Sequence, residues 1–489
     1  MPDKKNRKET AAPKKGEKTR STVRKPSIKK SAPEIILTQE TQQGWGKHDT
    51  AVGLGASPSS LDELVRAVRI KEPSRRIGRG LGRAYGDAAM NDGGVAIRFN
   101  RLDRAVSFDP ETGLLVAEAG MTLAAILRMC VPQGWFLPVT PGTAHPSLGG
   151  SVACDVHGKN HHNAGTIGSH VKWIDLVIAD GDVVRCSPKR NKALFNATIG
   201  GMGLTGLIYR VALQMHKIET SFIVEEANRV GSLPEMMERL TVSDATHPYT
   251  VSWVDGVSPG PSLGRGHVLL GRHASLGELK DRQRNCPLAP ASEGAIPVPF
   301  TPPLSLVNNL TVRMFNALQY HRAPARVRTH TIPFRPYFYP LDIATNWNRL
   351  YGTRGFYQYQ YVVPFEDGEV IVRETLSRLQ KEAKLPSLIV LKRFGDEGEG
   401  YLSFPKPGWV IAIDIPISDG LDSILNEFDA MVAMTGGRVY LVKDARMSPE
   451  TFRRMYPRFG EWLKVKNEVD PKWTFSSNLS RRLKMEEGV

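Results

Sequence analysis

The sequence RRIGRGLGRAYGD at residues 75–87 contains four glycines and four arginines within thirteen positions. Glycine tolerates positive φ and lets other groups approach the backbone, so successive N–H groups of such a loop can converge on a phosphate. Ordinary tight turns account for the same composition. The spacing departs from the dinucleotide fingerprint, because Gly80 and Gly82 are followed by Gly86 and no amphipathic helix opens after it. The loop therefore indicates phosphate binding outside a Rossmann fold.

Two further glycine clusters follow in the same half of the chain. PGTAHPSLGGSVA at residues 141–153 leads directly into CDVHGKNHH at 154–162, and GGMGLTGLI occupies residues 200–208. Small residues followed by titratable ones suit a backbone that wraps a flat cofactor and ends beside a substrate. The three histidines within 157–162 offer a metal site as the alternative, but HExxH and a second set of ligands are missing nearby.

Helical and strand patterns are mixed around these clusters. Apolar spacing and turn residues predict a helix after Ser60, strands at 95–99 and 114–117, a helix after Thr122, a hairpin at 174–185 and a strand at 207–215. Ser60 and Glu63 have the spacing of a capping box, and Asp180-Gly181 suits the hairpin turn. Because the elements do not alternate strictly, the fold class is predicted to be α+β.

Charge and cysteine content limit the class of protein. Residues 1–30 hold twelve Lys/Arg against three acidic residues, a net charge of +9 within a total of +15. We expect residues 1–33 to form a disordered basic tail, either simply solvated or in contact with anionic lipid or nucleic acid. The four widely spaced cysteines and the lack of a signal sequence or an apolar span favour a cytoplasmic protein, peripheral at the inner membrane at most.

The region after residue 280 carries two further expectations. Proline, alanine and glycine dominate 286–303, which predicts a mobile loop there. Apolar residues then mark one helical face at Val307, Leu310, Met314, Ala317 and Leu318, with arginines nearby. This helix either packs its face on the core or presents a surface to a membrane-bound, anionic substrate.

At this point a family resemblance becomes specific. The motifs that carry it are GLGRAYGD (80–87), PGT (141–143), CDVHGKNHH (154–162), GLTG (203–206), GFYQYQ (355–360), LKRFG (391–395), LSFP (402–405) with Gly408-Trp409, and GGRVYLVKD (436–444). In order and spacing they resemble the decaprenylphosphoryl-β-D-ribose 2-oxidase family, the flavin subunits of a 2′-epimerase, which has the vanillyl-alcohol-oxidase-like (PCMH-type) FAD fold. The resemblance covers nearly all of the chain after residue 40.

The resemblance implies two domains, with a substrate domain built on an antiparallel sheet. The expected limits are 34–220 for the FAD-binding domain, 221–437 for the substrate domain and 438–489 for a segment returning to the FAD domain. By resemblance, the catalytic groups are His157, Lys443 and Tyr440, and the substrate-binding ones are Tyr85, Lys159, Trp253, Gln358, Gln360 and Lys392. The implied cofactor contacts are Arg79, Gly80, Leu81, Gly82, Arg83, Ala84, Tyr85, Gly142, Thr143, Gly149, Gly150, Ser151, Cys154, His157, Gly158, Asn160, His161, Gly203, Thr205, Gly206, Tyr440 and Lys443.

The implied reaction removes hydride from C2 of a ribofuranose that a phosphate joins to a polyprenol, and a separate short-chain reductase completes the epimerisation. Lys443 is expected at the flavin and Lys392 at the substrate, while the base stays open between His157, Lys443 and Tyr440. Two departures from the family matter. Arg83 stands where relatives with covalent FAD have histidine, so FAD is expected to be non-covalent. Ala412 stands where actinobacterial members have cysteine, and Val410 replaces a polar residue.

Two rival functions are weighed against this one. An aldonolactone or other sugar oxidase of the same fold usually carries His-Trp-x-Lys near the C-terminus, whereas residues 470–475 read DPKWTF, without the histidine. A basic nucleic-acid-binding protein would rely on the N-terminal tail, which has no aromatic residue to stack on a base. The sugar oxidase is the nearer rival.

Overall fold

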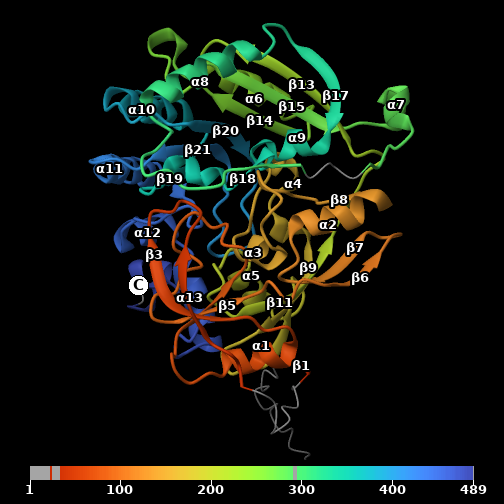
Figure 1. The fold of residues 1–489 in the computed structure, drawn as a ribbon, viewed down its shortest axis with the longest axis vertical. Helices are drawn as coiled ribbons and strands as arrows, with labels where there is room; N and C mark the ends of the chain where they lie inside the picture. The colour runs from red at the N-terminus through yellow and green to blue at the C-terminus, as the bar shows by residue number, and fades with distance from the viewer. Residues whose placement is uncertain (1–21, 25–33, 290–293, 488–489) are drawn as a thin grey trace, which may run out of the picture.

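The computed structural model describes residues 22–24, 34–289 and 294–487. Helices are mixed with sheets that are mainly antiparallel, which confirms the predicted α+β class. The six-stranded and four-stranded sheets lie in the lower half of Figure 1 and the eight-stranded sheet in the upper half. Most of the predicted basic tail lies outside the described residues, as do 290–293 of the predicted loop, so the mobility of both stays a prediction.

Two sheets carry the first part of the chain. The six-stranded antiparallel sheet has the order β1 (Thr22–Arg24), β10 (Val183–Cys186), β9 (Val171–Val177), β11 (Leu207–Gln214), β7 (Leu114–Glu118) and β6 (Ala105–Asp109). The four-stranded sheet has the order β2 (Thr38–Gln43), β3 (Thr50–Ala56), β5 (Val95–Arg98) and β4 (Arg76–Arg79). In the predicted hairpin, β9 and β10 pair antiparallel with Ile174 opposite Cys186, which confirms it.

An eight-stranded antiparallel sheet dominates the later part. Its order is β17 (Arg328–Pro333), β13 (Phe222–Val230), β15 (Gly266–His273), β14 (Tyr249–Val254), β20 (Leu388–Phe394), β21 (Gly408–Pro416), β19 (Phe356–Val363) and β22 (Arg438–Val439). Two short pairs complete the strands: β8 (Trp135–Phe136) with β12 (His216–Lys217), and β16 (Ile296–Pro297) with β18 (Ala344–Thr345).

Helices cover these sheets. Those of the first part are α1 (Leu61–Val68), α2 (Leu123–Cys130), α3 (Leu148–Ala153), α4 (His161–Ala164) and α5 (Lys192–Thr198). The later ones are α6 (Leu233–Ser243), α7 (Asp281–Arg284), α8 (Asn309–Arg322), α9 (Phe334–Phe338), α10 (Gly368–Lys381), α11 (Leu421–Met434), α12 (Pro449–Met455), α13 (Phe459–Val469) and α14 (Asn478–Arg482).

Both N-terminal helices begin where the sequence predicts. Thr122 caps α2, which buries Leu123, Ile126, Leu127 and Cys130 on one face. Ser60 caps α1 by accepting a hydrogen bond from the Glu63 N–H. The reciprocal half of the capping box differs, because the Glu63 carboxylate accepts from the backbone N–H and hydroxyl of Ser59 instead. Either arrangement supplies acceptors to N–H groups at the start of a helix.

Helix α8 corrects one of the two expectations for its apolar face. Leu310, Met314 and Leu318 are 68%, 66% and 73% exposed, so this face does not pack on the core. The sheltered residues are Val312 and Asn316 instead. Apolar spacing located the helix but could not reveal which side another element covers.

The C-terminal segment returns to the glycine loops. The Arg76 N–H donates to the Thr474 carbonyl at 2.7 Å, and the Ser476 N–H donates to the Arg76 carbonyl at 2.9 Å. Farther along, the Tyr85 N–H donates to the Val442 carbonyl at 3.1 Å. The domain limits stay a prediction, but these contacts place residues 442–476 against the first part of the chain.

Candidate active site

A cavity of about 1080 Å³ lies between the glycine loops and the eight-stranded sheet. One wall consists of residues from all three glycine clusters. The opposite wall comes from strands β14, β15, β19, β20 and β21, with α8, α9 and the segment that follows it. Sequence segments that are hundreds of residues apart therefore meet around one space.

The first glycine loop offers unused backbone donors to this cavity. The N–H groups of residues 81–84 donate to no acceptor among the described residues. Gly82 has φ of +64°, which favours glycine, and a Cβ on Gly86 would lie 1.8 Å from the Asp444 carbonyl oxygen. Four consecutive free N–H groups on a cavity wall fit the phosphate-binding backbone predicted from the sequence.

The second cluster is held by a residue that the sequence analysis missed. Asp342 accepts hydrogen bonds from the Thr143 hydroxyl at 2.6 Å and from the Ala144 N–H at 2.9 Å. Ser147 caps α3 by accepting from the Gly150 N–H. Because Asp342 lies 199 residues beyond Thr143, no local pattern connects the two. This carboxylate fixes the loop at residues 143–144 and itself lines the cavity.

The predicted catalytic groups meet at the end of the second cluster. Gln360 Nε2 lies within hydrogen-bonding distance of His157 Nε2, at 2.9 Å. The ring centroids of His157 and Tyr440 are 5.3 Å apart. Burial, together with Lys392, His161 and Lys443, lowers the pKa of His157 well below its ordinary value, so this imidazole is neutral. The Tyr440 hydroxyl donates to the Cys154 carbonyl at 2.7 Å, and burial raises its pKa.

Three lysines supply positive charge to the same cavity. Lys159, Lys392 and Lys443 line it and keep part of their surface accessible there, yet they lie deep within the protein. Burial lowers the pKa of Lys159 to about 7, of Lys392 to about 8 and of Lys443 to about 7. None forms an ion pair with a described carboxylate. Such a cluster favours an anionic ligand.

The Lys443 ammonium group lies beside an aromatic ring and near a buried carboxyl group. Its ammonium nitrogen lies 3.6 Å from the centroid of the Tyr85 ring. Asp414 was missed by the sequence analysis; burial raises the pKa of its carboxyl group, and this group acts electrostatically on Lys443. Gln358 donates to one oxygen of Asp414 at 2.6 Å, and the other oxygen is buried without a described partner.

Lys159 makes contacts that the sequence did not indicate. Its ammonium donates to the Tyr337 carbonyl and, at 3.3 Å, to the Phe338 carbonyl. The lysine therefore also fastens α9 to the second glycine cluster.

Most of the predicted site residues do line the cavity. Those that the structure brings together are Gly80, Leu81, Gly82, Arg83, Ala84, Tyr85, Gly142, Thr143, Gly149, Gly150, Ser151, Cys154, His157, Gly158, Lys159, Gly203, Gly206, Trp253, Gln358, Gln360, Lys392, Tyr440 and Lys443. Four others, Arg79, Asn160, His161 and Thr205, do not line it.

These four residues bond within the protein instead. Arg79 donates to the carbonyls of Ala89 and Gln43, and Asn160 donates to that of Pro138. The Thr205 hydroxyl bonds to Thr198, and His161 Nδ1 accepts from the Gly395 N–H at 3.1 Å. They support the loops that carry the lining.

The side chains of His157, His161 and His162 do not converge on one position. His161 and His162 bond to Gly395 and to the His247 carbonyl, respectively, whereas His157 faces Gln360. Within residues 34–289 and 294–487, no group of three potential ligands could hold a metal ion.

Buried polar atoms without partners in the cavity lining show whether FAD fits the cavity. Arg83 Nε, His157 Nδ1 and Trp253 Nε1 belong to lining residues and are buried without a described partner. A buried polar atom without a partner is unfavourable, so such atoms mark where a ligand supplies the missing bonds. Together with the free N–H groups of residues 81–84 and the three lysines that lack an ion pair, they fit an elongated anionic cofactor such as FAD.

The side chain of Arg83 leads to a prediction about cofactor attachment. Its guanidinium carbon lies 4.1 Å from the centroid of the Trp45 ring, and arginine has no nucleophilic nitrogen available at neutral pH to bond the flavin. We expect acid precipitation of the purified protein to release all of its FAD into the supernatant. Flavin fluorescence that stays with the precipitated polypeptide on a denaturing gel would contradict this prediction.

Comparison with known proteins agrees with this geometry. A family model described as an FAD binding domain matches residues 54–187. The chain is 37% identical over 460 residues to decaprenylphosphoryl-β-D-ribose oxidase of Mycolicibacterium smegmatis, covering 93% of this chain and 100% of the relative. It is 35% identical over 373 residues to an uncharacterized protein of Streptomyces coelicolor, covering 74% of this chain and all of that protein.

A more distant relative matches only the first part of the chain. A putative D-arabinono-1,4-lactone oxidase of Neurospora crassa is 24% identical over 180 residues, which covers 36% of this chain and 32% of the relative. The likeness to the ribose oxidase, by contrast, extends over both walls of the cavity. The chain is an FAD-dependent oxidoreductase and belongs to the decaprenylphosphoryl-β-D-ribose oxidase family.

Proposed function

We propose that this protein oxidises the C2 hydroxyl of a polyprenylphosphoryl-β-D-ribofuranose to the 2-keto sugar. The observation that carries the proposal is the group of three lysines, none in an ion pair with a described carboxylate, on a cavity that also presents free backbone donors. One anionic cofactor and one phosphate-linked sugar account for both features. The substrate named for the M. smegmatis relative supports this choice, since that relative aligns along its whole length.

The first two glycine clusters are the groups that would hold FAD, with the N–H groups of residues 81–84 on its diphosphate. When bound, FAD accepts the hydride that leaves the sugar. Lys443 is our choice for the base, because its pKa of about 7 leaves a neutral amine near physiological pH. After taking the hydroxyl proton, the resulting ammonium stabilises negative charge that develops beside it.

The other two candidate bases suit this step less well. The Tyr440 hydroxyl already donates to the Cys154 carbonyl, and its raised pKa makes the phenolate scarce. His157 is neutral, but its lowered pKa makes it a weak base. A hydrogen bond from Gln360 orients the His157 imidazole, so we assign His157 to positioning the sugar.

Lys392 is our choice for the substrate phosphate. It projects from β20 into the cavity and has no ion pair with a described carboxylate. Because a hydrogen bond to a charged group contributes about 1.5–3 kcal/mol, Lys392→Ala should raise KM for the prenylphosphoryl sugar by roughly 10- to 100-fold. Steady-state kinetics with a phosphate-free riboside provide the control, since KM for that compound should stay unchanged. Equal losses for both compounds would contradict the assignment.

The same lysines predict a bell-shaped pH profile for kcat/KM. Activity should rise as pH increases through the lowered pKa of Lys443, because only the neutral amine accepts a proton. It should fall at higher pH as Lys392, whose pKa is about 8, loses the positive charge that binds phosphate. Initial rates between pH 5 and 10 measure both limbs, and Lys392→Ala should lose the alkaline one. A profile without an acidic limb would contradict the role of Lys443.

The direct test is an anaerobic titration of the purified holoenzyme. Visible flavin absorbance should bleach on addition of a prenylphosphoryl ribose and stay unchanged with gulonolactone. Bleaching by the lactone alone would overturn the substrate while keeping the cofactor. The lactone oxidase is the weaker candidate, because its relatives match only about a third of this chain.

Two partners complete the proposal. A 2-keto sugar must be reduced again to reach the arabinose form, and this requires a separate short-chain reductase. The prenyl chain implies contact with a membrane surface, while within the described part of the chain no helix is both long and apolar enough to cross one. The protein would therefore meet its substrate peripherally.

A further inference from the structure

Exposed apolar side chains are concentrated in one segment of the chain. Ten of the nineteen large apolar residues that are exposed among those described lie between residues 296 and 343. They are Ile296, Phe300, Leu304, Leu306, Leu310, Met314, Phe315, Leu318, Val327 and Ile343. Isolated exposed apolar residues are ordinary, but such a concentration marks an interaction surface.

The outer side of α8 forms the centre of this surface. Leu310, Met314 and Leu318 follow one another at four-residue intervals and therefore share one side of the helix. The opposite side holds α8 in place, since Val312 and Asn316 are buried and the ring of Tyr320 stacks on His267. In Figure 1, α8 lies at the outer end of the molecule, at the top, beside the eight-stranded sheet. We call Leu310, Met314 and Leu318 the α8 face.

Positive charge lies on α8 and on the segment that follows it. Arg313, Arg322, Arg326 and Arg328 are exposed, and none is paired with a described acidic residue. Asp342 is the only acidic residue between 296 and 343, and it is buried beneath the loop at residues 142–144. An apolar segment that carries exposed arginines and no exposed acidic residue of its own complements a bilayer with anionic headgroups.

This surface is continuous with the candidate active site. Phe315, Gln319 and Arg322 of α8 line the cavity, as does Ile343. The strand containing Ile296 pairs with the strand directly after Ile343, so both exposed isoleucines lie at the same rim. A prenyl chain attached to a sugar in the cavity can therefore leave it along the Phe315 side of α8.

We propose that the α8 face inserts into the surface of an anionic bilayer and that the cavity opens towards this membrane. The proposal builds on the proposed function, because the membrane then supplies the prenylphosphoryl sugar while its lipid chain stays in the bilayer. Apolar contact holds α8 at the depth of the upper acyl chains, and the four arginines meet lipid phosphates.

Vesicle co-sedimentation of the full-length holoenzyme tests this proposal without any substrate. The variant Leu310→Glu/Met314→Glu/Leu318→Glu places three charges on the α8 face. A matched control, Val242→Glu/Val370→Glu/Met434→Glu, changes residues of similar exposure, 64%, 68% and 70%, on α6, α10 and α11. Wild type and control should bind phosphatidylcholine–phosphatidylglycerol vesicles alike, whereas the α8 variant should bind roughly tenfold or more weakly.

A second variant tests the charged border. Arg326→Gln/Arg328→Gln should weaken binding by roughly fivefold per arginine on vesicles with phosphatidylglycerol. The change should be much smaller on phosphatidylcholine alone. Every variant keeps the N-terminal tail, so attraction by the tail is the same in all of them. Equal binding by wild type and the α8 variant would overturn the proposal, as would absence of wild-type binding.

Kinetics separate this proposal from the proposed function. The α8 variant should reduce its flavin normally with a short-chain substrate in detergent and lose at least about tenfold in rate with a long-chain substrate in vesicles. If wild type binds vesicles through α8 but no prenylphosphoryl ribose bleaches its flavin, the proposed function fails and the docking surface stands.

Discussion

Lys443→Ala is expected to slow flavin reduction by about 10²- to 10³-fold, the usual loss when one electrostatic or proton-accepting group is removed from an active site. The lysine lines the cavity beside Tyr85, and burial lowers its pKa to about 7. Both proposed roles, taking the hydroxyl proton and placing a positive charge beside the cofactor, depend on this one amine. Stopped-flow loss of visible flavin absorbance under anaerobic conditions measures the step directly.

Lys443→Arg separates the two roles. Arginine keeps the charge but does not give up a proton near neutral pH, so this variant should be nearly as slow as Lys443→Ala if the lysine is the base. Added primary amines should then restore part of the alanine variant's rate, with more basic amines giving larger rescue. Full activity of Lys443→Arg would show that only the positive charge at this position is needed, and the role of base would then be assigned to His157. FAD content of each variant must equal that of wild type for the comparison to hold.

Local patterns in the sequence predicted the walls of this site but not their supports. The glycine clusters could be recognised because a ligand can approach backbone N–H groups only where consecutive residues are small. All three clusters line the cavity. Asp342 and Asp414 could not be found in this way, because each acts across a contact that depends on the tertiary fold. Arg79, Asn160, His161 and Thr205 stand inside the same motifs, yet their side chains bond to the loops rather than line the cavity.

The apolar face of α8 shows another limit of periodicity. The spacing of Leu310, Met314 and Leu318 correctly predicts a helix, but a helical pattern contains no information about what lies opposite it. In α2 the same kind of face is buried by the protein itself. The exposed fractions in α8, which only the structure provides, exclude core packing of this face, and its contact with a membrane is our proposal.

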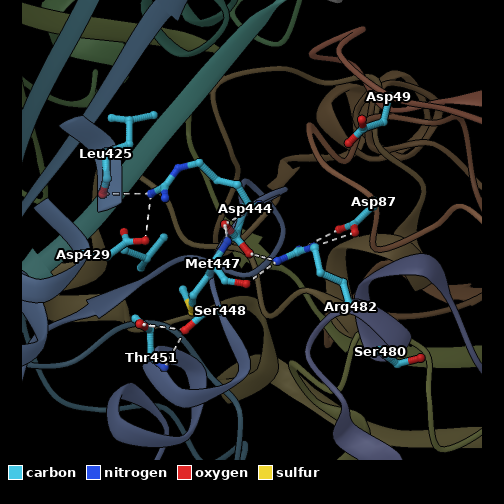
Figure 2. Close-up of polar contacts among 12 residues, drawn as sticks. Asp49, Asp87, Leu425, Asp429, Asp444, Met447, Ser448, Thr451, Ser480 and Arg482 are labelled. Carbon is cyan, nitrogen blue, oxygen red and sulfur yellow. Dashed lines mark hydrogen bonds and ion pairs between the residues drawn. The ribbon is translucent and has the colours of Figure 1, made fainter. Parts of the chain in front are cut away.

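The second large effect is expected at Arg482, which connects the first glycine loop to the turn after β22 that carries Lys443. Figure 2 shows this guanidinium between Asp87 and Asp444. It donates to both oxygens of Asp87 at 2.9 Å, forms an ion pair with Asp444 at 2.9 Å and donates to the Met447 carbonyl. Asp87 is the last residue of the first glycine loop, and Asp444 directly follows Lys443, so one arginine positions both groups of the site.

Arg482→Ala should lower the free energy of unfolding by about 3–5 kcal/mol, because two buried carboxylates lose their counter-charge. Asp87 and Asp444 are only 4% and 5% exposed, so water cannot replace the guanidinium. Urea unfolding followed by circular dichroism measures the change, and flavin fluorescence during dilution should reveal weaker FAD binding. Arg354→Ala is the matched control: its partner Asp419 is exposed, and that ion pair should contribute less than about 1 kcal/mol.

A compensated variant distinguishes lost pairing from lost packing at Arg482. Arg482→Met/Asp87→Asn/Asp444→Asn removes the positive charge together with both negative charges, so no buried ion is left uncompensated. If uncompensated charge causes the loss, this triple variant should recover most of the stability that Arg482→Ala lacks. FAD affinity should stay low, because the neutral side chains no longer tie the first glycine loop to residues 443–444. A triple variant as unstable as Arg482→Ala would instead assign the effect to packing of the arginine side chain.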